Sequence, residues 1–300
     1  MASPLRGRFA PLLPWLLVAV WLALGYGALR LAWLTGHGPT HEAIVAYGER
    51  RIAALAADPE ALQVVMLGSS ILKHATRNEP EFDAALTAAA GRRAHSLRLV
   101  DDLATYAEFA PLAPALLAAR PELLVLQAEL LVQDLTWDQW QKQLRSFGRS
   151  RILEPGLWHP WGGTPERLQA EVPCGDRPAD RDAARRRDLI GVHLRIAPEA
   201  PGPRAARTLV AQAQAAGIQV VVVDFPRSAA YRALVPRAPA LDAARDAAVA
   251  AGAVALSFDG VVPDEQFCDA VHVDGRGRAV LSAWLAQRLA ALAATPSASP

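Results

Sequence analysis

Short apolar segments alternate with helical segments along most of this chain, and this alternation restricts the folds that it can adopt. Strands are predicted at 62–67, 95–100, 123–127, 218–224 and 253–258, and helices at 79–90, 103–119, 204–216, 240–251 and 277–294. Strands that alternate with helices form α/β folds. We therefore expect a doubly wound, three-layer fold with a five-stranded parallel sheet. Its active site should lie beyond the carboxyl ends of the strands.

An uncharged apolar segment at 9–29 precedes this pattern. As a helix it would be about 31 Å long, the thickness of the hydrocarbon core of a bilayer. Arginines precede it, which predicts a cytoplasmic N-terminus and an exported remainder. We expect 9–34 to anchor the chain in a bacterial inner membrane as a single pass, with the catalytic domain in the periplasm. A cleavable signal peptide is the alternative, but its apolar part is shorter and is followed by small residues.

The remaining domain boundaries follow from composition. We expect a cytoplasmic N-terminus at 1–8, an amphipathic linker helix within 35–61, an α/β domain at 62–294 and a disordered tail at 295–300. Segment 131–203 is too long and polar for an ordinary connection, so it is interpreted as an insertion beside the site. Four tryptophans lie in it, which either stack on sugar rings or form a local core: Trp137, Trp140, Trp158 and Trp161.

Charge and cysteine content limit the function classes further. The net charge is +1, without the concentrated basic face that nucleic-acid binding requires. The two cysteines, Cys174 and Cys268, could pair in an oxidising compartment or remain separate buried thiols, and their spacing does not decide between these.

Ser70 is the first candidate catalytic residue. It ends the motif Gly68-Ser69-Ser70, which follows the first predicted strand and precedes a helix. A serine at this point lies where backbone N–H groups favour a developing oxyanion. An N-capping serine without a catalytic role fits the same pattern.

Asp269 and His272 are the second part of the candidate site. They stand three residues apart, just before the last helix. This spacing allows the carboxylate to bind imidazole Nδ1 and leaves Nε2 free to accept a serine proton. A surface turn or a pair of metal ligands would show the same pattern. A metal site would need further ligands, which this region does not supply, so we expect neither metal nor cofactor.

The two motifs together resemble the SGNH/GDSL hydrolase superfamily, whose first block ends in Gly-x-Ser and whose last block is Asp-x-x-His. The resemblance implies a triad of Ser70, Asp269 and His272 that forms an acyl-enzyme. It also implies oxyanion donors after the second and third strands, where a glycine and an asparagine are usual. Here 101–105 and Gln127 stand at those places. The expected donors are therefore the Ser70 backbone and the Gln127 amide, while Glu129 would oppose an oxyanion.

With its N-terminal span, the chain is similar to membrane-anchored SGNH-like proteins of envelope polysaccharide O-acylation, such as alginate O-acetyltransferase-like proteins. That similarity implies an exported glycan or another acyl ester as substrate and a multi-span acyltransferase as partner. His74, one turn after Ser70, and Arg227, after the fourth strand, are candidate substrate-binding residues. Two alternatives remain: a catalytically weak or inactive SGNH scaffold that binds a glycan or acyltransferase, and a secreted esterase. The acyl group, the acceptor and the oligomeric state are left open.

Overall fold

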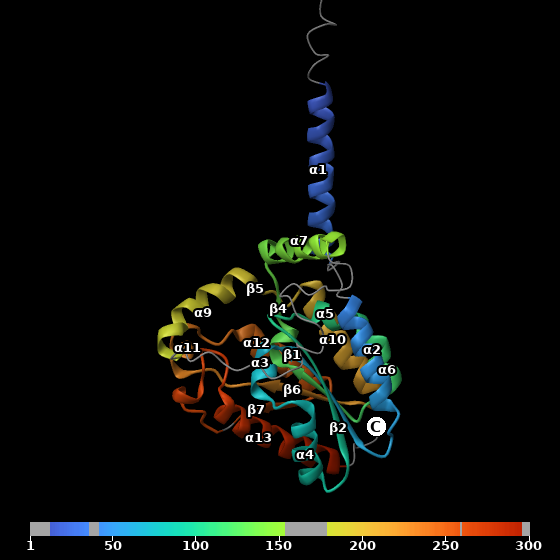
Figure 1. Cartoon of the computed structure of the whole chain (residues 1–300), viewed down its shortest axis with the longest axis vertical. Coiled ribbons are helices and arrows are strands. Elements are labelled where there is room, and N and C mark those ends of the chain that lie inside the picture. Colours follow the sequence, from blue (N-terminus) through green and yellow to red (C-terminus); the bar gives the residue numbers. More distant parts are fainter. Residues whose placement is uncertain (1–12, 36–41, 154–178, 259, 296–300) are drawn as a thin grey trace, which may run out of the picture. The chain divides into compact units, whose positions relative to one another are not determined.

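The computed structural model describes residues 13–35, 42–153, 179–258 and 260–295. The chain divides into two compact units, residues 1–38 and 39–300, which are described separately. Within the first unit, α1 (Leu13–Leu34) is a continuous helix (Figure 1). Most of its large apolar side chains are exposed, whereas Trp33 is buried. Its segment Pro14–Leu34 is long and apolar enough to cross a membrane, a property that signal sequences share. The guanidinium of Arg30 lies 4.4 Å from the centre of the Trp33 ring.

The second unit contains the five-stranded sheet that the sequence predicts. Its strands are β1 (Leu62–Ser69), β2 (Ala94–Asp101), β3 (Leu123–Gln127), β6 (Gln219–Asp224) and β7 (Val254–Ser257). They pair in the order β2-β1-β3-β6-β7, and every pair is parallel. Parallel strands joined by helices bring all five carboxyl ends to one edge of the sheet. The expected α/β fold is therefore confirmed.

Helices cover both faces of the sheet, because alternate side chains of each strand point to opposite sides. In β1, Val65 and Leu67 join one core cluster, whereas Val64 and Met66 join the other. The first face carries α2 (Glu42–Ala56), α5 (Tyr106–Phe109), α6 (Ala113–Ala119), α10 (Pro201–Ala215) and α12 (Pro239–Ala250). The second carries α3 (Ser70–Ala75), α4 (Glu79–Ala90) and α13 (Gly275–Ala294) (Figure 1).

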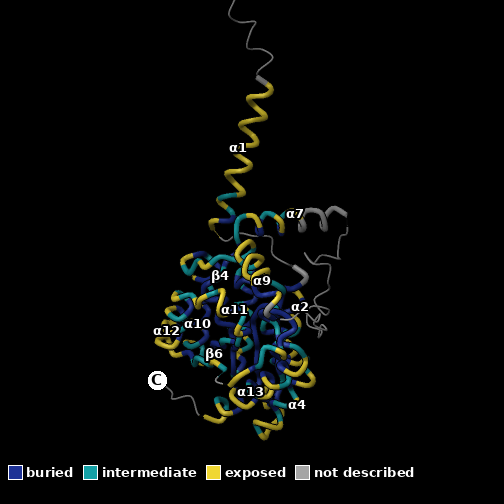
Figure 2. The backbone as a smooth tube through the Cα atoms, turned by 90° about the vertical axis from the view of Figure 1, so that its left-hand side faces the viewer, coloured by how far each residue is buried: buried dark blue, intermediate teal, exposed yellow. Residues whose placement is uncertain are grey.

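Helix α2 is part of this layered structure. The side chains of Tyr47, Ile52 and Leu55 are buried in the first core cluster. Figure 2 shows that the buried residues are concentrated in the sheet and on the inner sides of the helices. In the second unit, α2 thus packs on the domain and contributes to its core, although the sequence suggests a linker.

The described parts of segment 131–203 form a small subdomain next to the sheet. Strands β4 (Gln133–Leu135) and β5 (Leu194–Ile196) pair antiparallel, and between them lie α7 (Trp137–Leu153) and α9 (Ala179–His193). Trp137 and Trp140 stack on each other with their ring centres 5.2 Å apart, and Trp140 is buried. These two tryptophans therefore pack locally. Trp158, Trp161 and the tail at 296–300 lie outside the described residues.

Candidate active site

The turn from β1 into α3 presents the hydroxyl of Ser70 at the carboxyl edge of the sheet. Ser69 is the N-cap of α3, and its Oγ accepts a hydrogen bond from the Ile71 N–H at 3.3 Å. The capping role therefore belongs to Ser69, and the Ser70 side chain is available for another partner. Gly68 allows the close packing of this turn, since a Cβ there would lie 2.6 Å from Leu72 Cβ and 2.8 Å from Gln127 Oε1.

Ser70, His272 and Asp269 lie in line, although 202 residues separate the first two. His272 Nε2 lies 2.8 Å from Ser70 Oγ, and His272 Nδ1 lies 2.8 Å from Asp269 Oδ2. The loop that carries the histidine and the aspartate ends at α13, whose N-cap Asp274 accepts hydrogen bonds from the Arg276 and Gly277 N–H groups. The spacing Asp-x-x-His works because the loop folds back: Asp269 Oδ1 accepts hydrogen bonds from the N–H groups of Val271 and His272 at 2.9 and 2.8 Å.

The Asp269 carboxylate is buried but stays ionised. Burial alone would raise its pKa, but the hydrogen bond and charge of His272, the Val271 N–H and the nearby Arg186 together hold the pKa well below its usual range. Arg186 of α9 makes an ion pair with Asp269 Oδ2. In the sequence, the basic run 185–187 is typical of a solvated helix face and does not by itself indicate a site residue. The spacing of Asp182 and Arg186, one helical turn apart, is the only sequence signal for its fixed position.

His74 lies beside the same histidine. The His74 and His272 ring centres are 4.5 Å apart, with the planes tilted by 38°. Burial, together with the nearby His272 and Arg278, lowers the pKa of His74 from 6.5 to about 3. His74 is therefore neutral near pH 7 and is suited to pack against His272 or to bind substrate, but not to compete for protons.

Gln127 contacts Ser69, the residue before the candidate nucleophile. Its Oε1 accepts a hydrogen bond from the Ser69 N–H at 2.8 Å, and its Nε2 donates to Ser69 Oγ at 3.0 Å. Only 1% of the residue is exposed. The expected role was an amide donor to the oxyanion, whereas in the structure both polar atoms of the side chain hold the β1–α3 turn.

Helix α3 is also held at its other end. Arg98, a fully buried residue of β2, donates hydrogen bonds to the backbone carbonyls of Thr76 and Arg77 at 2.9 and 3.0 Å. Arg278 of α13 donates to the His74 carbonyl at 3.1 Å. These bonds satisfy carbonyls at and just beyond the end of a helix too short to be stable by itself. The position of Ser70 thus depends on side chains from several elements.

The segment after β2 contains acidic side chains where the SGNH resemblance calls for a glycine. Asp101 is buried at the end of β2, next to Glu108 of α5. Burial and the negative charge of Asp101 raise the pKa of Glu108 well above its ordinary value. Leu103 has a φ of 59°, a left-handed conformation that is rare for a bulky residue. The chain therefore makes the turn without a glycine.

Glu129 and Arg227 form an ion pair beyond the ends of β3 and β6. Their side chains are 10% and 14% exposed. Arg227 also donates a hydrogen bond to the Phe225 carbonyl at 2.9 Å. Glu129 Oε1 binds the arginine, whereas Glu129 Oε2 is buried without a hydrogen-bond partner in the described part of the chain. The charge of Glu129 is thus balanced by Arg227 and does not act alone on the site.

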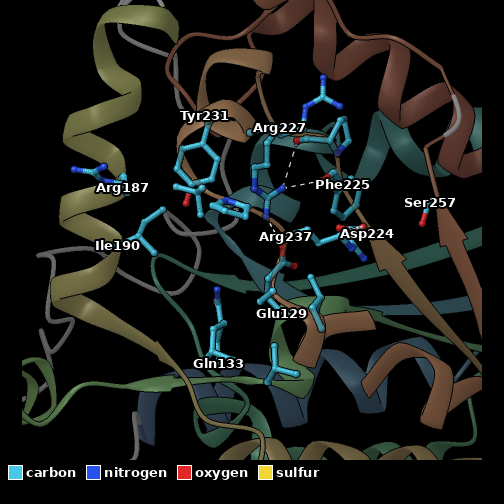
Figure 3. A pocket seen from close by; sticks show the side chains of 18 of the residues that line it. Glu129, Gln133, Arg187, Ile190, Asp224, Phe225, Arg227, Tyr231, Arg237 and Ser257 are labelled. Atoms are coloured by element: carbon cyan, nitrogen blue, oxygen red, sulfur yellow. Dashed lines mark hydrogen bonds and ion pairs between the residues drawn. The ribbon is translucent and has the colours of Figure 1, made fainter. Parts of the chain in front are cut away.

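This ion pair lies in a pocket of about 670 Å³ at the carboxyl ends of β3, β6 and β7 (Figure 3). Ile190 and Arg187 of α9 line one side, and Tyr231 of α11 (Ala229–Leu234) lies near them. Ser228, which follows Arg227, donates its hydroxyl to the Ala270 carbonyl at 2.9 Å. The pocket wall is thereby connected to the loop that carries Asp269 and His272.

The remaining predictions concern metal and disulfide chemistry. Among the described residues, no three His, Cys, Asp or Glu side chains group in a way that could hold a metal ion. Cys268 takes part in a disulfide. Cys174, the other cysteine of the sequence, lies outside the described residues.

Comparisons with known proteins give matches in structure only. No protein-family model and no curated protein sequence matches the chain. Similar solved structures include a protein assigned to the lipolytic G-D-S-L family from Desulfitobacterium hafniense DCB-2, with 11% identity, a TM-score of 0.38, and coverage of 76% of this chain and 99% of that one. A GDSL-like lipase from Bacteroides thetaiotaomicron VPI-5482 has 13% identity and a TM-score of 0.39, with coverage of 83% and 99%.

Proposed function

We propose that this protein is a membrane-anchored SGNH-like serine esterase or O-acyltransferase that acts on an exported glycan or another acyl ester of the cell envelope. The observation that carries the proposal is the alignment of Ser70 Oγ, His272 and Asp269, with both hydrogen-bond distances at 2.8 Å. This is the separation at which a histidine can accept the proton of a serine nucleophile. The motifs Gly68-Ser69-Ser70 and Asp269-x-x-His272 support the family assignment.

The proposed reaction has two half-reactions. His272 Nε2 takes the Ser70 proton as Ser70 Oγ forms a bond to the acyl carbonyl carbon. The bond from that carbon to the leaving oxygen then breaks, and the leaving oxygen takes the proton from Nε2. In the second half-reaction, water or a sugar hydroxyl gives its proton to Nε2 and attacks the acyl carbon. The bond from that carbon to Ser70 Oγ then breaks, and Oγ takes the proton from Nε2. Asp269 keeps Nδ1 protonated and offsets the imidazolium charge throughout.

The oxyanion side of the site favours a slow or specialised enzyme. The Ser70 N–H is the donor that the proposal relies on, because the Gln127 amide is engaged with Ser69. Loss of one oxyanion donor costs on the order of 10²–10³ in rate. The engagement of Gln127 also favours the second candidate function, a catalytically inactive scaffold that binds a glycan or an acyltransferase partner.

The pocket beside Glu129 and Arg227 is the proposed binding site for a glycan, although Ser70, Asp269 and His272 are not among its lining residues. Tyr231 and Phe225 are aromatic residues of the pocket lining, although both are largely buried. The lining contains two carboxylates, Glu129 and Asp224, and five arginines: Arg187, Arg195, Arg227, Arg232 and Arg237. Arg187, Arg195, Arg227 and Arg237 already form ion pairs within the protein, so the proposal of an acidic sugar unit relies mainly on the exposed Arg232.

A labelling experiment tests the enzyme against the scaffold. The full chain in detergent is incubated with a fluorophosphonate probe and, separately, with an aryl acetate. We expect Ser70-dependent labelling and hydrolysis, both abolished in Ser70→Ala. Ser297→Ala, a substitution in the C-terminal tail, is the control and should react like the wild type. Equal labelling of the wild type and Ser70→Ala would reject the catalytic role of Ser70 and leave the scaffold.

Binding measurements test the acidic glycan. Tetragalacturonate and its methyl-esterified form serve as acidic and neutral probes. We expect Arg232→Gln to weaken binding of the acidic probe by about two- to fivefold, as loss of one exposed charge implies, with little effect on the neutral probe. Arg92→Gln, which removes a surface arginine next to the amino end of β2, is the matched control. An equal loss for both probes would argue against charge recognition in the pocket.

Membrane anchoring through 9–34 and a multi-span acyltransferase partner complete the proposal. The long apolar helix α1 is compatible with such an anchor. In this arrangement the acyl group would cross the membrane through the partner and reach Ser70 on the exported side. Co-purification of this chain with a multi-span protein from the membrane fraction would support the partner, and a chain that purifies alone under mild detergent would argue against a stable complex.

A further inference from the structure

Arg186 lies on α9, in the segment of the chain between β3 and β6, and its guanidinium binds Asp269 of the candidate site. We propose that Arg186 is a positioning residue that fixes the Asp269 carboxylate and limits how strongly His272 holds a proton. The inference rests on the proposed function of Ser70, Asp269 and His272. It goes beyond that function because it assigns part of the catalytic geometry to the segment inserted between β3 and β6.

Four donors surround the Asp269 carboxylate and leave it a single orientation. Oδ1 accepts hydrogen bonds from the backbone N–H groups of Val271 and His272. Oδ2 binds His272 Nδ1 and the guanidinium of Arg186. A carboxylate with both oxygens occupied by fixed donors cannot rotate without breaking charge-assisted hydrogen bonds. Arg186 thus acts on His272 through Asp269.

Arg186 is itself held in place. Its Nε donates a hydrogen bond to Asp182 Oδ2 at 2.8 Å, one turn earlier in α9, and Asp182 is buried. On the same helix, Ala183 packs in an apolar cluster with Ala270 and Val271. Arginine suits this arrangement because its planar fork can hold two carboxylates at once. The helix and the catalytic loop are therefore joined by both an ionic and an apolar contact.

The charge of Arg186 also affects proton transfer. Asp269 stabilises the imidazolium that forms when His272 accepts the Ser70 proton, and a cation on the same carboxylate oxygen weakens this stabilisation. Among the described residues, the charged and titratable side chains near Asp269 and His272 include His74 and Lys73 of α3, Arg278 of α13, and Arg186 and Asp182 of α9.

NMR titration of His272 tests the proposal without depending on turnover. The imidazole signals of the full chain in detergent micelles are followed with pH and assigned with His272→Gln. We expect Arg186→Gln to move the His272 titration midpoint upward by about 0.5–1 pH unit, the effect of losing one charge at a partly screened distance. Arg186→Lys, which keeps the charge, should restore most of the wild-type midpoint. Arg185→Gln, at the exposed neighbouring position, is the matched control and should leave it unchanged.

Kinetics on an aryl acetate give a second measurement. In Arg186→Gln we expect the acidic limb of the kcat/KM profile to move to higher pH by the same amount, with KM unchanged. Arg186→Met, which keeps the aliphatic stem, replaces the glutamine variant if that variant does not fold. A His272 midpoint identical in the wild type and the neutral variants would overturn the proposal, as would an equal shift in Arg185→Gln. If the proposed function is wrong but the role of Arg186 is right, the wild type will show no Ser70-dependent hydrolysis, while Arg186→Gln will still shift the His272 midpoint in the NMR titration.

Discussion

At the scale of single residues, the candidate site depends on a few buried polar side chains that act on their neighbours. Ser70 is available to His272 because Ser69 caps α3, and Ser69 is held by Gln127. Asp269 is oriented by two backbone N–H groups and by Arg186. Substitutions next to the triad should therefore affect stability and geometry before they affect the chemistry itself.

Gln127→Ala should reduce the free energy of unfolding by about 1–3 kcal/mol, because it leaves the buried Ser69 N–H without its acceptor. Urea unfolding of the full chain in detergent measures this change. Gln287→Ala, at an exposed position of α13, is the matched control and should stay within about 0.5 kcal/mol of the wild type. Equal effects of the two substitutions would contradict a structural role for Gln127.

The half-buried His74 should make the protein less stable at acidic pH. Its pKa is lowered from 6.5 to about 3 in the folded state, so the unfolded chain binds a proton that the folded one does not between these values. The contribution of neutral His74 to the free energy of unfolding is complete above about pH 6.5 and is lost as pH falls towards 3. In urea titrations, His74→Gln should show a flatter pH dependence in this window and run parallel to the wild type above pH 7. If the unfolding free energy of His74→Gln depended on pH as steeply as that of the wild type, the lowered pKa of His74 would be contradicted.

At the scale of elements, the loop that carries Asp269 and His272 is fixed by the helices that pack against it. It ends in the N-cap of α13 and packs against α9 and α11 through Ala270 and Val271. The segment 131–203 looks like an accessory insertion in the sequence. In the structure, helix α9 of this segment contributes Arg186 to the candidate site and also forms part of the pocket wall.

Asp274→Ala should destabilise the protein by about 0.5–2 kcal/mol, since Asp274 accepts hydrogen bonds from two N–H groups at the start of α13. We also expect slower aryl acetate hydrolysis, because His272 lies two residues before this cap. Asp246→Ala, an exposed carboxylate on α12, is the control for unfolding and for activity. Unchanged unfolding of Asp274→Ala would show that the cap does not hold the loop.

The disulfide at Cys268 immediately precedes Asp269. The sequence contains only one other cysteine, so we predict an intrachain link between Cys174 and Cys268. Peptide mapping without reduction should recover the two cysteine-containing peptides as one crosslinked species. A disulfide-linked dimer on a non-reducing gel would instead indicate a bond between two chains.

At the scale of the whole molecule, the chain combines an apolar helical unit with an α/β domain. The first unit has the length and composition of a membrane span, and the second has its own core on both faces of the sheet. This division predicts that the membrane attachment and the chemistry can be separated experimentally.

If α1 is an uncleaved anchor, the chain should stay in the membrane pellet after alkaline carbonate extraction and require detergent for release. N-terminal sequencing of this fraction should begin at residue 1 or 2. A soluble chain that begins near residue 30 would show that the segment is a signal peptide. The α/β fold and the candidate site would be unaffected by that result.

The sequence by itself determined the fold class and the three residues of the candidate triad. Alternation of apolar and helical segments predicts the sheet because a strand that is buried on both faces is a short, continuously apolar run. Gly68-Ser69-Ser70 and Asp269-x-x-His272 are local motifs, so they can be read before any tertiary contact is known.

Only the tertiary structure decided which side chains meet across distant segments. Gln127 binds Ser69, Glu129 binds Arg227, and Arg186 binds Asp269 over 83 residues of sequence. Such pairs form where separate elements pack, and charge or residue type along the chain does not encode which partners will be adjacent. For that reason the residues of the candidate triad could be predicted from the sequence, whereas the residues that hold them in place could not.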